Sequence, residues 1–286
     1  MEGDDFIKDT MTWSFSRLNY NCLCEWRRRY IDCDKEHSQG NFFASVGGLM
    51  HKIFEKYVKG ELEIFEISQY FIDHWDEWVK EPAPYSKNGD MKEKYYNDCL
   101  DYLDNLSLNY DKYNILGVEK EMRTQIPTGG DPIDMIGYID LLVEDKETKE
   151  ITIFDYKSAI IKWKKRKPDE PLKSDVAHWL AFQRQLYIYS KMVMEKYRRP
   201  VKHLGWIMFR ANEVRKIEWN QQDYNAAIKW AGDTADALRS VHDYPPNLDS
   251  SNRYYCINLC SYRDSCVYRA EQAEFERKMR NGDYAP

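Results

Sequence analysis

The chain has 286 residues, of which 43% are hydrophobic and 31% charged, and its formal net charge at pH 7 is −6. This composition is typical of a globular protein with a full core, and it argues against a general nucleic-acid coat protein while leaving room for an enzyme that meets DNA through one basic surface. No apolar run approaches the ~20 residues that cross a membrane, and the opening MEGDDFIKDT is too acidic and polar for a secretory signal, so we expect a cytoplasmic protein.

Helical patterns dominate the first hundred residues. Apolar side chains recur there at the i, i+3, i+4, i+7 spacing of an amphipathic helix. The first helix is expected to be capped by Ser14 or Ser16, and Pro82 and Pro84 end the third. Four helices are predicted, over residues 12–31, 45–59, 61–80 and 90–107.

The pattern changes at Gly117 to short apolar runs that are typical of strands. Three strands are predicted, in GVEKEMRTQIP, GYIDLLVED and ITIFDYKSA. The chain then predicts a charged loop over 162–171, a helix over 175–197, a hairpin over 203–220 and a helix over 221–241. This order of elements predicts an α/β protein in which a small mixed sheet is flanked by helices.

Two carboxylates and a lysine stand at the ends of the second and third strands. Asp140 lies in the second, and Asp155 and Lys157 end the third, after a charged turn. A hairpin of these strands brings Asp140 and Asp155 together, and the period of two places Asp155 and Lys157 on one face. Converging carboxylates repel each other unless a cation lies between them, and oxygen ligands suit Mg²⁺ or Mn²⁺. The pattern therefore predicts a divalent-metal site.

Cysteines gather near both ends of the chain. In a reducing compartment, clustered cysteines indicate metal or cluster ligation more often than disulfides. Cys256, Cys260 and Cys266 fall within eleven residues, and Cys22 or Cys24 could supply a fourth thiolate. Four thiolates suit either Zn²⁺ or an iron–sulfur cluster.

A basic run follows Lys157 directly. Residues 157–167, KSAIIKWKKRK, contain six basic residues and no acidic one. Charge attracts a phosphate backbone, and an aromatic ring can stack on an unpaired base. The nucleic-acid-binding residues predicted from this run are Lys162, Trp163, Lys164, Lys165, Arg166 and Lys167.

These motifs together resemble the PD-(D/E)xK nuclease superfamily, in particular its RecB-like, iron–sulfur branch, which includes the CRISPR-adaptation exonucleases. Ile139 stands where the proline of the family's name would be, and the spacing from Cys256 to Cys260 is one residue longer than usual. The motifs that carry the resemblance are Gly48-x-x-His51-x-x-x-Glu55, Asp140, Asp155-x-Lys157, Gln185-x-x-x-Tyr189 and the terminal cysteines.

The resemblance implies a restriction-endonuclease-like α/β core with an N-terminal helical insertion and a cysteine-stapled C-terminal region. It implies a single RecB-like nuclease domain over residues 1–286. Within it, we expect a helical part over 45–110, a catalytic core over 115–241, and a cysteine region made by 14–31 and 242–270.

The resemblance also implies roles for individual residues. Metal binding is expected at His51, Asp140, Asp155 and the carbonyl group of Tyr156. Lys157 is expected to orient water or stabilise negative charge. Gln185 and Tyr189 are expected beside the active site, in contact with DNA or with Lys157. Glu55 is a possible partner that orients His51, and Glu119 or Glu121 is expected to support the site from outside.

The expected cofactors are Mg²⁺ or Mn²⁺ and a [4Fe–4S] cluster. The cluster ligands implied are Cys22, Cys256, Cys260 and Cys266, with Cys24 as the alternative to Cys22 and zinc as the alternative to the cluster.

The implied function is metal-dependent hydrolysis of DNA, by an exonuclease in preference to an endonuclease. The substrate would carry single-stranded regions or free ends, and a helicase or recombinase is a possible partner. The alternative is a non-catalytic DNA-binding or scaffold subunit of a helicase–nuclease or recombination complex.

Overall fold

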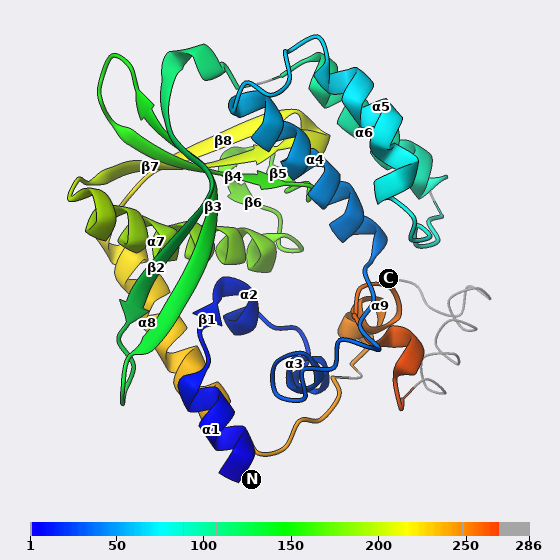
Figure 1. Ribbon diagram of the computed structural model, residues 1–286, viewed down its shortest axis with the longest axis vertical. Coiled ribbons are helices and arrows are strands. Elements are labelled where there is room, and N and C mark those ends of the chain that lie inside the picture. The colour runs from blue at the N-terminus through cyan, green and yellow to red at the C-terminus, as the bar shows by residue number, and fades with distance from the viewer. Residues whose placement is uncertain (1, 88, 107, 248, 269–286) are drawn as a thin grey trace.

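A mixed six-stranded sheet forms the centre of the protein (Figure 1). The computed structural model describes residues 2–87, 89–106, 108–247 and 249–268. The sheet strands are β1 (Trp13–Ser14), β2 (Tyr113–Ile126), β3 (Ile133–Asp145), β4 (Ile151–Lys157), β7 (Val201–Met208) and β8 (Glu213–Glu218). A separate small hairpin consists of β5 (Trp163–Lys164) and β6 (Lys167–Pro171).

Strand β3 organises the sheet, because three other strands pair with it. β2 runs antiparallel along one edge of β3. The other edge is shared: β1 pairs in parallel with Met135 and Ile136, and β4 pairs antiparallel from Leu141 to Glu144. β7 then lies parallel to β4, and β8 antiparallel to β7. The short stretch of β3 between its two partners is where Asp140 lies.

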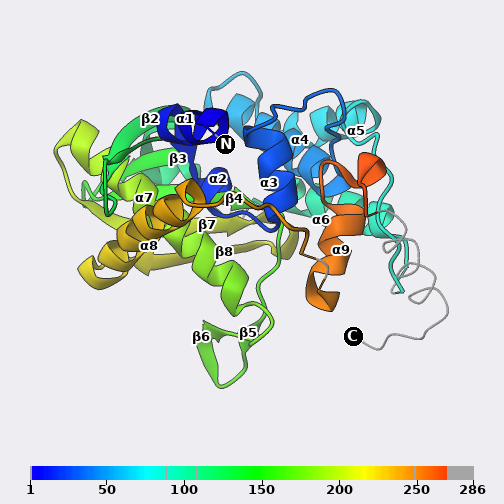
Figure 2. The same ribbon diagram turned by 90° about the horizontal axis from the view of Figure 1, so that it is seen from below.

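Helices cover both faces of the sheet (Figures 1 and 2). On one face lie α7 and α8, and α7 makes the crossover that two parallel strands require. On the other face lie α4, α5 and α6. These helices are α4 (Phe42–Val58), α5 (Ile67–Trp78), α6 (Met91–Asp104), α7 (Val176–Tyr197) and α8 (Gln221–Arg239).

The two faces bury separate hydrophobic clusters. Residues from α7 and α8 join one cluster, and residues from α4, α5 and α6 join the other. The apolar stripe predicted for the helix over 45–59 is present: its buried members are Val46, Leu49, Met50, Ile53 and Phe54. Burial of this stripe fixes α4 against the sheet and therefore fixes the direction in which its polar face points.

The segment around α3, near the start of the chain, contacts the last described segment, which contains α9. The carboxylate of Glu25 in α3 accepts hydrogen bonds from the Tyr255 hydroxyl and the Ser261 backbone N–H. Arg28 donates to the Ser265 carbonyl group at 3.2 Å. The elements of this region are α1 (Glu2–Thr10), α2 (Phe15–Leu18), α3 (Leu23–Tyr30), α9 (Ser250–Asn258) and the 3₁₀ turn Arg263–Ser265. Two further 3₁₀ turns are Tyr110–Lys112 and Phe209–Ala211.

Several predicted element boundaries were wrong. Residues 12–31 form a short strand and two helices instead of one helix, because the first helix ends at Leu18 with Asn19 as its C-cap. Ser14 does cap this first helix, since its hydroxyl accepts a hydrogen bond from the Arg17 N–H. The helix predicted over 61–80 begins only at Ile67. Helix α1 was not predicted, and residues 269–286, which include the end of the predicted cysteine region, lie outside the described residues.

The charged segment after β4 is an ordered hairpin and not a loop. β5 and β6 pair antiparallel and extend away from the main body (Figure 2). Glu170 holds the ammonium groups of both Lys164 and Lys167. Because this carboxylate offsets part of the positive charge of the two lysines, the repulsion that favours a loop is reduced.

Across the described residues, no helix combines the length and the apolar character that a membrane span requires.

Candidate active site

The candidate site begins where β3 and β4 separate. Their last paired residues are Leu141 and Phe154, so the next residues along, Asp140 and Asp155, stand at the opening. The backbone N–H of Tyr156 has no partner on β3 there, and it donates instead to the Asp140 carboxylate at 2.8 Å. The separation of two strands thus holds an acidic side chain in a fixed orientation.

Asp155 and Lys157 point to the face of the sheet that α7 covers. The Lys157 ammonium lies 2.7 Å from Asp155 Oδ2 and donates to Gln185 Oε1 at 2.9 Å. Gln185 in turn donates to the Tyr189 hydroxyl, at 3.4 Å. A Cβ on Gly137 would lie only 2.5 Å from the Tyr189 ring, so this glycine lets the ring pack onto β3. These predicted residues form one chain of polar contacts.

His51 approaches from the opposite face, on α4. Its Nδ1 lies 3.1 Å from Glu119 Oε1 and 3.8 Å from Asp140 Oδ2. Its Nε2 lies 3.3 Å from the Tyr156 carbonyl oxygen. Among the described residues, His51, Glu119 and Asp140 form the one group of three whose ligand atoms all lie within 4.8 Å of one another.

Glu119 reaches this group through an unusual backbone conformation. Its φ angle is +45°, in the left-handed region that side chains other than glycine rarely adopt. Pairing of β2 with β3 skips this residue, passing from Val118–Leu141 to Lys120–Ile139. Such strain persists where the surroundings demand it and often marks a functional position. Sequence reasoning assigned Glu119 only an outer, supporting place, because a local irregularity of this kind leaves no periodic signal.

The acidic groups shift one another's protonation. Burial, and then the charge of Asp155, raise the pKa of Asp140 to about 7. Burial alone would lower the pKa of His51, but the hydrogen bond to Glu119 and the charges of Asp140 and Asp155 raise it to about 9. The shift of His51, and the part of the Asp140 shift that Asp155 causes, both come from the carboxylates gathered here.

The donor set fits a divalent cation. Asp155 is 2% exposed, and its Oδ2 accepts no well-formed hydrogen bond from the described residues, although Lys157 lies beside it. Carboxylates, a carbonyl oxygen and one imidazole are ligands that Mg²⁺ and Mn²⁺ accept in proteins, and the imidazole favours Mn²⁺.

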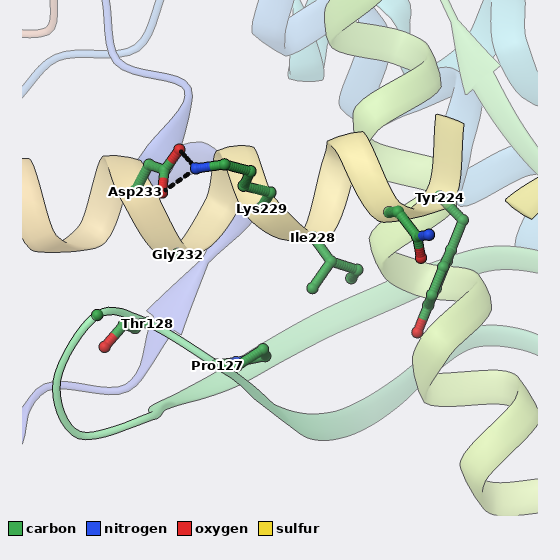
Figure 3. A pocket seen from close by; sticks show the side chains of 9 residues that line it. Pro127, Thr128, Tyr224, Ile228, Lys229, Gly232 and Asp233 are labelled. Carbon is green, nitrogen blue, oxygen red and sulfur yellow. Dashed lines mark hydrogen bonds and ion pairs between the residues drawn. The ribbon is translucent and has the colours of Figure 1, made fainter. Parts of the chain in front are cut away.

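An open cleft of about 720 Å³ adjoins this group. His51 and Glu119 form part of its wall, and α4 supplies most of the remainder. A smaller hollow of about 380 Å³ lies between the β2–β3 turn and α8, where Lys229 pairs with Asp233 (Figure 3). None of the residues around that hollow belongs to the predicted site.

Three side chains do not take the positions that the sequence suggested for them at the site: Glu55, Trp163 and Glu121. Glu55 does not orient His51; it pairs with Lys52 at 2.8 Å and with Lys59, because α4 turns it towards lysines at the helix surface. Trp163 does not lie in a flexible loop. Its ring packs edge-on to Trp179, lies 4.0 Å from the Arg215 guanidinium carbon, and donates from Nε1 to Glu213. Glu121 also stays outside, held by Arg123 and Tyr138.

The cysteines of both chain ends converge. The sulfur atoms of Cys22 and Cys24 lie 3.1 Å apart, and the Asn247 N–H donates to Cys22 Sγ. The hydrogen bond from Cys24 lowers the pKa of Cys22 to about 6. Burial raises the pKa of Cys256 to about 11 and that of Cys260 to about 12. Within the described part of the chain, no three thiols are as close together as the ligands of the His51 group.

Comparison with known proteins identifies the family. The model of the PD-(D/E)XK nuclease superfamily matches residues 12–267, and the chain belongs to this superfamily. No curated protein is significantly similar in sequence. Similar solved structures include SSO0001, with a TM-score of 0.38, 16% identity, and coverage of 90% of this chain and 85% of that one. They also include a candidate exonuclease from Eubacterium rectale, with a TM-score of 0.45, 11% identity, and coverage of 88% and 90%.

Membership of the superfamily makes the protein a metal-dependent nuclease with DNA as its substrate. It agrees with the mixed sheet and flanking helices described above, and with the group formed by His51, Glu119 and Asp140.

Proposed function

We propose that this chain is a catalytically active deoxyribonuclease, an exonuclease of the RecB-like branch. The observation that carries the proposal is the convergence of His51, Glu119 and Asp140 beside the Asp155–Lys157 pair. A degraded active site would mark a non-catalytic subunit, whereas here each member of one set of expected polar side chains contacts at least one other member; the set is His51, Asp140, Asp155, Lys157, Gln185 and Tyr189.

Asp140, Glu119, His51 and the Tyr156 carbonyl group are the proposed metal-binding groups, with Asp155 joining them. When bound, a divalent ion lowers the pKa of a water molecule and neutralises charge on the phosphate. Lys157 would exchange its contact with Asp155 for the attacking water or a phosphate oxygen.

Gln185 and Tyr189 are proposed as positioning residues. Gln185 accepts a hydrogen bond from Lys157, and Tyr189 fills the space above Gly137. Together they hold the ammonium group over the end of β4, where a scissile phosphate would lie.

The β5–β6 hairpin is proposed to contact the DNA backbone. Lys162, Lys165 and Arg166 are exposed, and Lys164 and Lys167 share Glu170. Phosphate contacts of this kind depend on charge and not on sequence. Trp163 would serve as the fixed base of the hairpin instead of a stacking surface.

The cysteine region is proposed to bind a [4Fe–4S] cluster, through Cys256, Cys260, Cys266 and either Cys22 or Cys24. The convergence of thiols from both chain ends supports a thiolate-ligated group. Iron and sulfide analysis of anaerobically purified protein tests this; zinc without iron would refute it.

Cleavage of end-labelled single- and double-stranded DNA with Mn²⁺, Mg²⁺ or EDTA tests the function. The wild type is compared with Lys157→Ala and with Lys229→Ala, a control on the outer surface of α8. We expect metal-dependent cleavage that only Lys157→Ala abolishes, and a product ladder that gives polarity. Binding without cleavage under every metal would instead favour a scaffold subunit that works with a helicase or recombinase.

A further inference from the structure

The cleft beside the metal-binding group has an unusual wall. One face of α4 supplies Phe43, Ala44, Gly47, Gly48 and, one turn further on, His51. Three of these residues have almost no side chain, so the helix backbone itself forms much of the surface. The wall leads directly to His51, and therefore to the reacting centre that the proposed function places there.

Two adjacent glycines in the middle of a helix are unfavourable, because glycine is the poorest helix former after proline. Gly48 has a reason within the protein: a Cβ there would lie 3.2 Å from the Trp78 ring. Gly47 has none, since a Cβ there would meet no atom within 4 Å. The packing of the chain therefore does not require glycine at position 47, although the space in front of it belongs to the cleft.

Aromatic side chains surround this bare surface. Trp78 at the end of α5 packs against Gly48, Phe43 lies one turn before Gly47, and the Tyr138 ring, which is 51% exposed, faces the cleft from β3. A base in an unpaired strand has free faces that stack on aromatic rings. The cleft volume of about 720 Å³ falls within the ~300–1,000 Å³ typical of sites for small ligands, which suits one or two nucleotides.

We propose that this cleft binds the nucleotide next to the scissile phosphate in an unpaired strand, and that Gly47 determines which substrates fit by leaving room for it. The inference rests on the proposed nuclease function and deepens it. Glycine at this position allows the close approach of a helix backbone to a ligand. Lys52 also lines the cleft, and its ammonium group now contacts Glu55 at 2.8 Å; in the proposal it would exchange that carboxylate for the adjacent phosphate.

The test compares Gly47→Phe and Gly47→Ala with Gly3→Phe, a control at a helical glycine that likewise has nothing within 4 Å. Each variant is assayed on a single-stranded oligonucleotide, and the rise in melting temperature caused by Mn²⁺ is measured as a report on the metal centre that needs no substrate. We expect Gly47→Phe to raise the KM for the oligonucleotide at least tenfold and to keep the Mn²⁺-induced rise in melting temperature. Gly47→Ala should fall between, and Gly3→Phe should match the wild type.

An unchanged KM in Gly47→Phe would overturn the inference while leaving the nuclease function intact. A wild type that does not hydrolyse the oligonucleotide with any metal would instead refute the function itself. If Gly47→Phe does not fold, an oligonucleotide with an abasic residue beside the scissile phosphate tests the wild type directly. A KM that rises at least tenfold supports the site, and an unchanged KM overturns it.

Discussion

The metal-binding edge of the sheet and the cysteine region are held in place by different means. At the sheet edge, β2, β4 and α7 position Glu119, Asp155 and Gln185 through ladders and helix packing that exist without any ion. In the cysteine region, short helices meet through a few polar contacts, such as those of Glu25 with Tyr255 and Ser261. The first arrangement is set by the fold, whereas the second depends on single side chains and on whatever the thiols bind.

This difference predicts that one region mainly affects activity and the other mainly affects stability. The site at the sheet edge concentrates negative charge and so costs stability until a cation binds. The cysteine region does not concentrate charge in this way, but it joins the segment around Glu25 to the segment from Tyr255 to Ser261. Substitutions in the two regions should therefore separate activity from stability.

The largest expected effect is on activity, at Glu119. Glu119→Gln removes a charge from the metal-binding group, so we expect cleavage of DNA to slow by at least about 100-fold, as when a charge-stabilising group is lost. Glu77→Gln is the matched control, because Glu77 is exposed on α5 and does not line the cleft. Equal activity of the two variants would remove Glu119 from the site. Steady-state cleavage rates at saturating Mn²⁺ provide the measurement.

The next effect is on stability, at Glu25. Its buried carboxylate accepts two hydrogen bonds across the chain ends, and hydrogen bonds to charged groups contribute about 1.5–3 kcal/mol each. Glu25→Ala should therefore lower the free energy of unfolding by about 3 kcal/mol or more, measured by denaturant titration. Glu36→Ala, at an exposed position, should change little. Hydrolysis of a small diester at low temperature should persist in Glu25→Ala; its loss would show that the regions are not separate.

Stabilisation of the protein by Mn²⁺ should depend on the His51 group and not on the cysteine region. Mn²⁺ at about 100 times its dissociation constant should add about 2.7 kcal/mol to the wild type, seen as a higher melting temperature. Glu119→Gln should lose most of this increase, and Cys260→Ser should retain it. Because the pKa of His51 is about 9 and a ligand must be unprotonated, affinity for Mn²⁺ should rise with pH between 7 and 9, by at most about tenfold per unit. Affinity that is independent of pH would exclude His51 as a ligand.

The smallest effect is expected at the β5–β6 hairpin. Replacing both Lys165 and Arg166 with glutamate should weaken DNA binding a fewfold and reduce its dependence on salt, because phosphate contacts release counterions. Hydrolysis of a small diester should be unchanged. The paired substitution Lys229→Glu and Lys202→Glu, on other surfaces, controls for net charge. An identical salt dependence in the hairpin variant and the wild type would show that DNA does not reach the hairpin.

Much of the fold could be predicted, because the spacing of apolar residues along the chain distinguishes helices from strands. The stripe from Val46 to Phe54 predicted α4, and the apolar runs around Asp140 and Asp155 predicted β3 and β4 as a hairpin, which the structure confirms. The family model agrees with the fold class and the superfamily that the motifs indicated.

The features that could not be predicted depend on local or long-range contacts. The left-handed conformation of Glu119 arises from an irregularity in the ladder with β3, which a single sequence does not display. The ordered hairpin depends on Glu170, and the place of Trp163 depends on Trp179 and Arg215, which are distant in sequence. The roles of the site residues and the nature of the cysteine-bound group stay predictions.

The shared edge of β3 has a consequence for biosynthesis. The strand that carries Asp140 is completed on one side by Trp13 and Ser14, and the segment that follows them is held by residues near Ser261 and Ser265. On a ribosome, those last residues emerge only after the rest of the catalytic sheet has been made. A nascent chain therefore completes the surroundings of its active site only after the sheet has been made, so a product truncated before Ser261 would carry the acidic residues without this support.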